Sequence, residues 1–198
     1  MLEVRGPNVT LRLPAESDAP ALFELASDPE VTRWFSWGPY TEPSQALDWV
    51  RRNVDERESG ERLSLATVRG GEVLGIIELN ELSVRDRRAM MGVWLGRRAW
   101  GTGVNGEAQV LLLALSFSVL GLRRVGAYAN VDNARSDRAL RKAGYVPEGR
   151  LRRWHRHGDA ELDVFVYGVL AEEFAAPFEV EVRGEPPAAF VMPGATPS

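Results

Sequence analysis

The sequence of 198 residues contains no cysteine and only two histidines, His155 and His157. The lack of thiols excludes disulfides, thiolate zinc sites and a cysteine nucleophile. Two histidines and no ligand-like spacing of carboxylates lead us to expect no metal. No apolar run reaches the roughly 18–20 residues that cross a bilayer. The residues after Met1 lack the apolar stretch of a signal peptide. We therefore expect a cytoplasmic protein without a membrane partner.

The charge balance argues against nucleic acid as a direct partner. The net charge is −4, whereas proteins that bind nucleic acid carry a basic face or stripe. An RNA-binding module would need a basic face, and nothing in the net charge calls for such a face. The hydrophobic fraction of 44% is that of a globular domain that buries a sizeable core.

Apolar periodicity divides the chain into one domain, residues 1–172, and a proline-rich tail, residues 173–198. Period-two patterns predict strands at 9–13, 63–68, 73–79, 89–95, 123–129, 145–154 and 161–170. Helices are expected from 16 to the Asp28-Pro29 break, at 43–58, at 104–120 and at 133–143. The fold class is therefore mixed α/β, one sheet with helices on both faces. We expect the tail to be extended or frayed, docked at most through Phe190 and Val191.

A glycine-containing loop joins the strand 89–95 to the apolar helix 104–120. Residues 93–107 read V-W-L-G-R-R-A-W-G-T-G-V-N-G-E. Gly101 and Gly103 let the main chain approach a ligand closely, and amides at a helix start attract anions such as a pyrophosphate, to which Arg97 or Arg98 can add charge. The two glycines could equally make only a tight turn. The pattern is neither a Walker loop nor the dinucleotide fingerprint.

Two motifs in order resemble a known family. R-A-W-G-T-G at 98–103 resembles the acetyl-CoA signature R/Q-x-x-G-x-G/A of the GCN5-related N-acetyltransferases (GNAT). N-V-D-N-A-R-S at 130–136 resembles their next conserved segment, and A-L-R-K-A-G-Y follows at the family's distance. G-V-N-G-E-A at 103–108 and E-G-R-L-R at 148–152 resemble the RimJ/RimL branch, the ribosomal-protein alanine N-acetyltransferases. The likeness covers roughly residues 9–170.

This resemblance implies a GNAT fold, with a mostly antiparallel sheet that splays at the cofactor site. It implies transfer of an acetyl group from acetyl-CoA to a primary amine, of a protein N-terminus or a small molecule, by direct attack in a ternary complex. A backbone N–H near Val93 to Leu95 would stabilise the oxyanion. Ser136 would protonate the leaving thiolate and Asn133 would hold the pantetheine arm, although Asn133 is also a common helix cap. The implied cofactor-binding residues are Val93, Trp94, Leu95, Arg98, Trp100, Gly101, Thr102, Gly103, Val104, Asn105, Asn133 and Ser136.

The sequence does not identify which residue acts as the general base. Many relatives carry a glutamate where this chain has Met90, which cannot accept a proton. Glu78, on the neighbouring strand, is one substitute, because an apolar setting raises the pKa of a carboxyl group. His155 is another, because imidazole titrates near neutral pH, although adjacent arginines would lower its pKa. A water chain that ends on either residue is the third.

The aromatic segment with Trp34, Phe35, Trp37 and Tyr40 lies where the family builds its acceptor groove. These side chains could line a slot for the amine or simply pack beneath a loop. Because the strand glutamate is missing, a second hypothesis is that the protein is a non-catalytic sensor that binds CoA or another nucleotide. The sequence identifies neither the acceptor nor the oligomeric state, and a homodimer is compatible with it.

Overall fold

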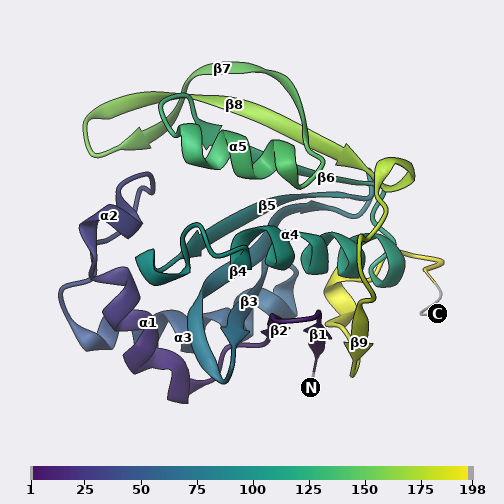
Figure 1. Ribbon diagram of the computed structural model, residues 1–198, viewed down its shortest axis with the longest axis horizontal. Helices are drawn as coiled ribbons and strands as arrows, with labels where there is room; N and C mark the ends of the chain where they lie inside the picture. Colours follow the sequence, from purple (N-terminus) through teal and green to yellow (C-terminus); the bar gives the residue numbers. More distant parts are fainter. Residues whose placement is uncertain (1, 196–198) are drawn as a thin grey trace.

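One sheet organises the part of the chain that the computed structural model describes, residues 2–195 (Figure 1). Its strand order is β7-β8-β6-β5-β4-β3-β2-β1-β9. The strands are β1 (Glu3–Arg5), β2 (Thr10–Arg12), β3 (Arg62–Arg69), β4 (Glu72–Ser83), β5 (Arg88–Leu95), β6 (Arg124–Asn130), β7 (Val146–His157), β8 (Ala160–Leu170) and β9 (Glu181–Arg183). The helices are α1 (Ala19–Ala26), α2 (Pro29–Thr32), α3 (Pro43–Ser59), α4 (Val104–Ala114) and α5 (Ala134–Lys142).

The parallel pair β5–β6 interrupts an otherwise antiparallel sheet. Pairing runs from Arg88 opposite Arg124 to Met91 opposite Ala127 and stops there. β5 continues to Leu95 and β6 to Asn130, so the two strands diverge beyond the last pair. The mostly antiparallel, splayed sheet expected from the sequence is confirmed.

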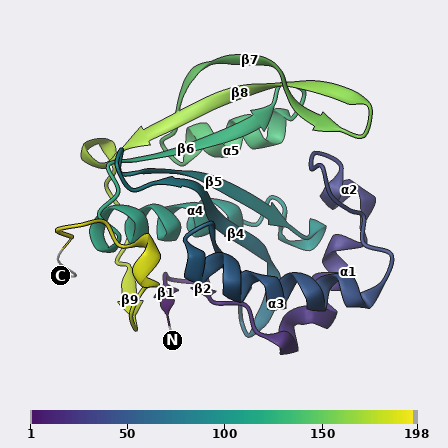
Figure 2. The ribbon, with the colours of Figure 1, turned by 180° about the vertical axis from the view of Figure 1, so that it is seen from behind.

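Helices cover both faces of the sheet. α1 and α3 pack on β3 and β4 on one face, and Figure 2 shows α3 in front of the sheet from that side. α4 and α5 lie together on the other face (Figure 1). Ala108, Leu111 and Leu112 of α4 are fully buried against the core, which is why this helix is apolar around most of its circumference. No helix among residues 2–195 could span a membrane.

The hairpin turns lie at the glycines where the sequence predicts them. Gly70 and Gly71 have φ of +60° and +85°, and the turn joins Arg69 to its partner Glu72 across β3 and β4. A left-handed backbone at both central residues matches the twist of the flanking strands, which accounts for the glycine pair. The turn after β7, at Gly158, lies where the sequence predicts it.

The predicted helix 104–120 is not one α-helix. α4 ends at Ala114, and a π-helical turn, Leu115–Val119, continues it. In this turn the N–H of Leu120 donates to the carbonyl of Leu115, five residues back, at 3.0 Å. The periodicity of apolar residues does not distinguish the two geometries in so short a stretch. Similarly, the Asp28-Pro29 break ends α1 but also starts α2, because Asp28 accepts from the Glu30 N–H at 2.9 Å.

The last two strands beyond β2, β1 and the edge strand β9, were not predicted. β1 and β9 have three residues each, too few for an alternating pattern, and β1 is stabilised by pairing with both β2 and β9. Phe190 is fully buried, which confirms the expected docking, and Val191 is half-buried. The Met192 N–H also donates to the carbonyl of Leu120 at 2.8 Å. The C-terminal segment is therefore packed against the core up to this point and is not frayed.

Candidate functional site

A cavity of about 540 Å³ lies where β5 and β6 diverge. It is bounded by the end of β5, the glycine loop, the starts of α4 and α5, the segment after α2, and residues after β8. The lining residues are Val31, Trp34, Phe35, Val93, Trp94, Leu95, Ala99, Trp100, Gly101, Gly103, Asn105, Gly106, Glu107, Val110, Asn133, Arg135, Ser136, Ala139, Lys142, Ala143, Pro177 and Phe178.

The glycine loop faces open space. Gly101 and Gly103 have φ of +74° and +88°, a conformation that side chains with a Cβ rarely adopt. A Cβ built at either position, or at Gly106 in the first turn of α4, would meet no atom within 4 Å. The backbone conformation therefore favours glycine at positions 101 and 103, and no side chain among residues 2–195, chain neighbours aside, lies within 4 Å of a Cβ built there.

The amides of this bend are free to bind a ligand. The first intrahelical bond of α4 described here is from Glu107 N–H to the carbonyl of Gly103, at 3.1 Å. No hydrogen bond described among residues 2–195 uses the N–H of Gly101 or of the four residues 103–106. Unpaired amides at a helix start, together with the positive end of the helix dipole, form an anion site.

The other predicted donors of the loop are engaged within it. The Trp100 N–H donates to Arg97 at 3.0 Å, and the Thr102 N–H and hydroxyl both donate to Ala99, at 3.4 and 2.8 Å. The side chain of Arg98 pairs with Glu72 at 2.9 Å and does not line the cavity.

Arg97 is also directed away from the loop, since it pairs with Asp28 at 3.4 Å. The cations that do line the cavity are Arg135 and Lys142, both on α5. Val104 is buried with its side chain in the core, so it can contribute only its backbone N–H to the bend.

The diverging end of β5 presents a further free amide. The Gly96 N–H donates to Leu74 of β4 at 2.8 Å. Because donors alternate along an antiparallel strand, the N–H groups of Val93 and Leu95 point the other way, toward β6. Pairing with β6 has already ended at Met91, so the Val93 N–H has no partner in the ladder. It is therefore free to donate a hydrogen bond to a ligand in the cavity that Val93 lines.

The start of α5 brings Asn133 and Ser136 into the cavity. The Asn133 side-chain oxygen accepts from the Ser136 N–H at 3.2 Å, so Asn133 caps the helix. No described hydrogen bond uses the Ser136 hydroxyl, which leaves it available to a ligand.

Glu78 does not line the cavity. It lies on the face of the sheet that α3 covers, opposite Gly92 of β5. A Cβ at Gly92 would lie 3.1 Å from a Glu78 carboxylate oxygen, so this carboxylate lies over the splayed part of β5. Ser64 and Asn80 each donate to it at 3.2 Å. Arg62 lies 3.6 Å away.

His155 is also outside the cavity, on β7, with its ring 5.6 Å from that of Tyr128 on β6. Burial lowers its pKa below the usual 6.5, and the charge of His157 lowers it further, while Glu81 opposes this. Burial and the neighbouring histidine therefore favour the neutral imidazole.

The predicted aromatic group divides into two pairs. Trp34 and Phe35 line the cavity, whereas Trp37 and Tyr40 do not. The Trp37 ring lies 5.4 Å from that of Trp94, 5.3 Å from Phe35 and 5.6 Å from Tyr40. Burial raises the pKa of the Tyr40 hydroxyl. Trp37 therefore packs beneath the cavity wall and supports Trp94.

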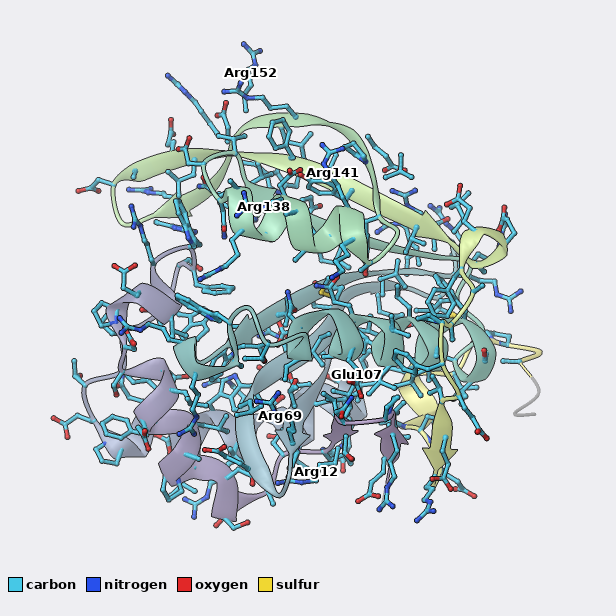
Figure 3. All side chains as sticks on the ribbon, viewed as in Figure 1. Arg12, Arg69, Glu107, Arg138, Arg141 and Arg152 are labelled. Atoms are coloured by element: carbon cyan, nitrogen blue, oxygen red, sulfur yellow. The ribbon has the colours of Figure 1, made fainter. Side chains whose placement is uncertain are left out.

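Several lining residues escaped the sequence analysis. Arg135, Ala139 and Lys142 recur at helical spacing on one side of α5, a signal that could have identified them. Pro177 and Phe178 had no local signal, because the pairing of β9 with β1 places the segment that precedes it. Glu107 accepts from Asn8 and Val9 at the turn before β2, and Figure 3 shows it extending from α4.

Comparisons with known proteins agree on one family. The acetyltransferase (GNAT) domain family matches residues 8–146. An uncharacterised N-acetyltransferase, p20 of Bacillus licheniformis, is 32% identical over 84% of this chain and 95% of its own length. The ribosomal-protein-serine acetyltransferase of Escherichia coli (strain K12) is 26% identical over 62% of this chain and 69% of its own. The solved structure of RimL, a ribosomal L7/L12 alpha-N-protein acetyltransferase in complex with coenzyme A, superimposes with a TM-score of 0.76 at 22% identity, covering 83% of this chain and 95% of RimL.

Proposed function

The chain belongs to the GNAT acetyltransferase family, and we propose that it transfers an acetyl group from acetyl-CoA to a primary amine within a ternary complex. The observation that carries this proposal is the run of free amides at Gly101 and residues 103–106, which faces the open cavity. A solved relative of the same fold holds coenzyme A. The two other cavities described, of about 340 and 160 Å³, are smaller.

Successive parts of the cavity suit the diphosphate, the thioester and the pantetheine arm of the cofactor. The amides at the start of α4 suit the diphosphate, since a helix N-terminus favours anions. The slot between β5 and β6 leads to the free Val93 N–H, where the thioester carbonyl would gain a donor as it becomes an oxyanion. Asn133 and Ser136 lie on the opposite wall, on α5. We propose that Asn133 contacts the pantetheine arm while it caps the helix.

The reaction must remove protons from the nitrogen and supply one to the sulfur. The amine must lose a proton before it attacks, because an ammonium group has no lone pair. Attack forms the C–N bond, and collapse of the tetrahedral intermediate breaks the C–S bond. We propose that the Ser136 hydroxyl, which has no described partner, donates a hydrogen bond or proton to the departing thiolate. The nitrogen loses a second proton as the intermediate collapses to the neutral amide; this proton balances the one gained by the thiol, and the proton lost before attack leaves through the base to solvent.

For the base we propose Glu78, acting through water. Its carboxylate lies over Gly92, at the point where β5 leaves β6, on the face of the sheet opposite α4. Ser64, Asn80 and Arg62 hold the carboxylate in place. Met90 lies two residues from Gly92 on the same face and supplies no acceptor. Glu78 thus provides the carboxylate that β5 lacks. His155 lies on β7, separated from β5 by two strands.

The acceptor is proposed only as a primary amine. A relative named as a ribosomal-protein-serine acetyltransferase supports a protein acceptor, and the aromatic pair Trp34 and Phe35 could hold either a peptide or a small amine against the cavity. Release of CoA thiol, followed over a panel of N-terminal peptides and small amines, tests the activity. Turnover on at least one amine supports the enzyme, whereas tight CoA binding without turnover on any would favour a sensor. The cytoplasmic location and the homodimer stay predictions.

A further inference from the structure

We propose that Arg135 binds phosphate at this site. The indole of Trp100 positions the guanidinium of Arg135 so that it can contact the diphosphate of CoA. The inference rests on the proposed function, since it concerns the same cavity. It supplies the phosphate-binding cation that the sequence analysis expected from Arg97 or Arg98, which pair with Asp28 and Glu72 instead.

The position of Arg135 is fixed by a stacking contact across the cavity. Its guanidinium carbon lies 3.4 Å from the centroid of the Trp100 ring, and both residues line the cavity. Trp100 is itself held, because its indole N–H donates to the carbonyl of Leu95 at 2.8 Å. A guanidinium on an aromatic face keeps its N–H groups free at the rim of the ring. The contact therefore joins α5 to the glycine loop and leaves the donors of Arg135 unused.

The charge of Arg135 has no counterion. No ion pair described among residues 2–195 includes it, whereas Arg141 on the same helix pairs with Asp137 at 2.8 Å. Burial lowers the pKa of Arg135, and the more distant Glu30 only partly offsets this. Arg135 is also the second residue of α5, where the helix dipole disfavours a cation. Arg135 is an exposed residue that is only partly desolvated on the indole, and an unpaired cation at a helix start is stabilised when an anion joins it.

Within the cavity, an anion can bind beside Arg135 at the free amides of the glycine bend. Glu107 also lines the cavity, but its carboxylate oxygen accepts from the N–H groups of Asn8 and Val9, both at 2.7 Å. Trp100 immediately precedes the bend whose free amides begin at Gly101. Arginine presents planar, paired donors that match phosphate oxygens. A diphosphate on these amides would thus meet the guanidinium from the opposite wall.

The experiment compares two ligands and two arginines. CoA carries phosphates and pantetheine carries none, so only CoA should sense Arg135. Arg138 is the matched control, because it is exposed on the same helix, as Arg135 is, but does not line the cavity (Figure 3). Calorimetric titration of the full chain should show that Arg135→Gln weakens CoA binding about tenfold, as expected for a lost charge-assisted bond. Arg138→Gln should leave it unchanged, and neither variant should alter pantetheine binding.

Arg135→Lys separates charge from shape. It should restore part of the CoA affinity, because an ammonium keeps the charge but not the paired donors. Equal losses of CoA and pantetheine affinity in Arg135→Gln would overturn the inference, since they would indicate a packing role. So would unchanged CoA affinity in a variant that melts like the wild type. If the wild type itself bound no CoA, the proposed function would fail, which is a distinct outcome.

Discussion

Gly75 of β4 lies so close to Trp94 of β5 that a Cβ on Gly75 would be 2.2 Å from the Trp94 carbonyl oxygen and 2.7 Å from the Cα of Leu95. Its φ of +150° is also one that residues with a Cβ rarely adopt. The absence of a side chain at Gly75 therefore sets how closely the end of β5 approaches β4. This contact helps to hold the edge of the cavity on which the Val93 N–H is presented.

Gly75→Ala should be severely destabilising, because backbone atoms of β5 would have to move. We expect a loss of about 3 kcal/mol in the free energy of unfolding and weaker CoA binding in whatever folded protein remains. Chemical denaturation measures the first effect. Gly149→Ala on β7 is the control, since its Cβ would make one ordinary contact at 3.9 Å. Equal stability of the two variants would contradict the close approach.

Glu78→Gln should lower kcat by about 100-fold, the usual cost of losing a general base. KM for acetyl-CoA should change little, because Glu78 does not line the cofactor cavity. His155→Gln is the comparison variant and should leave kcat unchanged. Steady-state kinetics of both variants across pH 6–9 checks this. The reverse result, with His155→Gln inactive and Glu78→Gln active, would assign the base to β7.

Asp18 should make stability depend on acid pH. Burial raises the pKa of Asp18, but hydrogen bonds from Arg12 at 2.7 Å and from the Ala15 N–H at 2.8 Å lower it below 3.8 on balance. A carboxyl group whose pKa is lower in the folded state stabilises the protein above its unfolded pKa of about 3.9, and the effect is lost as pH falls through the folded value.

Asp18→Asn should therefore cost about 2 kcal/mol near neutral pH, because it leaves Arg12 without its charge partner. The gap from the wild type should narrow below pH 4. Urea unfolding between pH 2.5 and 7 measures it, with the exposed Asp86→Asn as control. A gap that stays constant down to pH 2.5 would show that the Arg12–Asp18 pair does not supply this stability.

Phe190→Ala should destabilise the domain by about 3–5 kcal/mol, the usual cost of removing a fully buried phenylalanine. The C-terminal segment would then behave as part of the core and not as an independent tail. Thermal unfolding checks this against Val146→Ala, whose side chain is 52% exposed on β7. Comparable melting temperatures would mean that the segment is dispensable.

Local patterns predicted the central elements of the fold, since alternating apolar residues and the Gly70-Gly71 turn suffice for β3 and β4. They could not reveal β1 and β9, whose three-residue strands exist through pairing between the two ends of the chain. The same limit applies to the site. The glycine bend was readable because φ restricts the residue type, whereas Phe178 enters the cavity only through tertiary packing. Glu78 was one of the candidates named from the sequence and the spacing of Arg135 on its helix was readable, but which face of each element meets the cleft is set by tertiary packing.

The central claim is that the amides at the start of α4 bind the diphosphate of CoA. Calorimetric titration of the wild-type protein with CoA and with pantetheine tests it most directly, because the two ligands share the thiol arm and differ in the nucleotide and its phosphates. We predict one CoA per chain, bound at least about tenfold more tightly than pantetheine. Equal affinities for the two ligands, or no binding of CoA, would contradict the account.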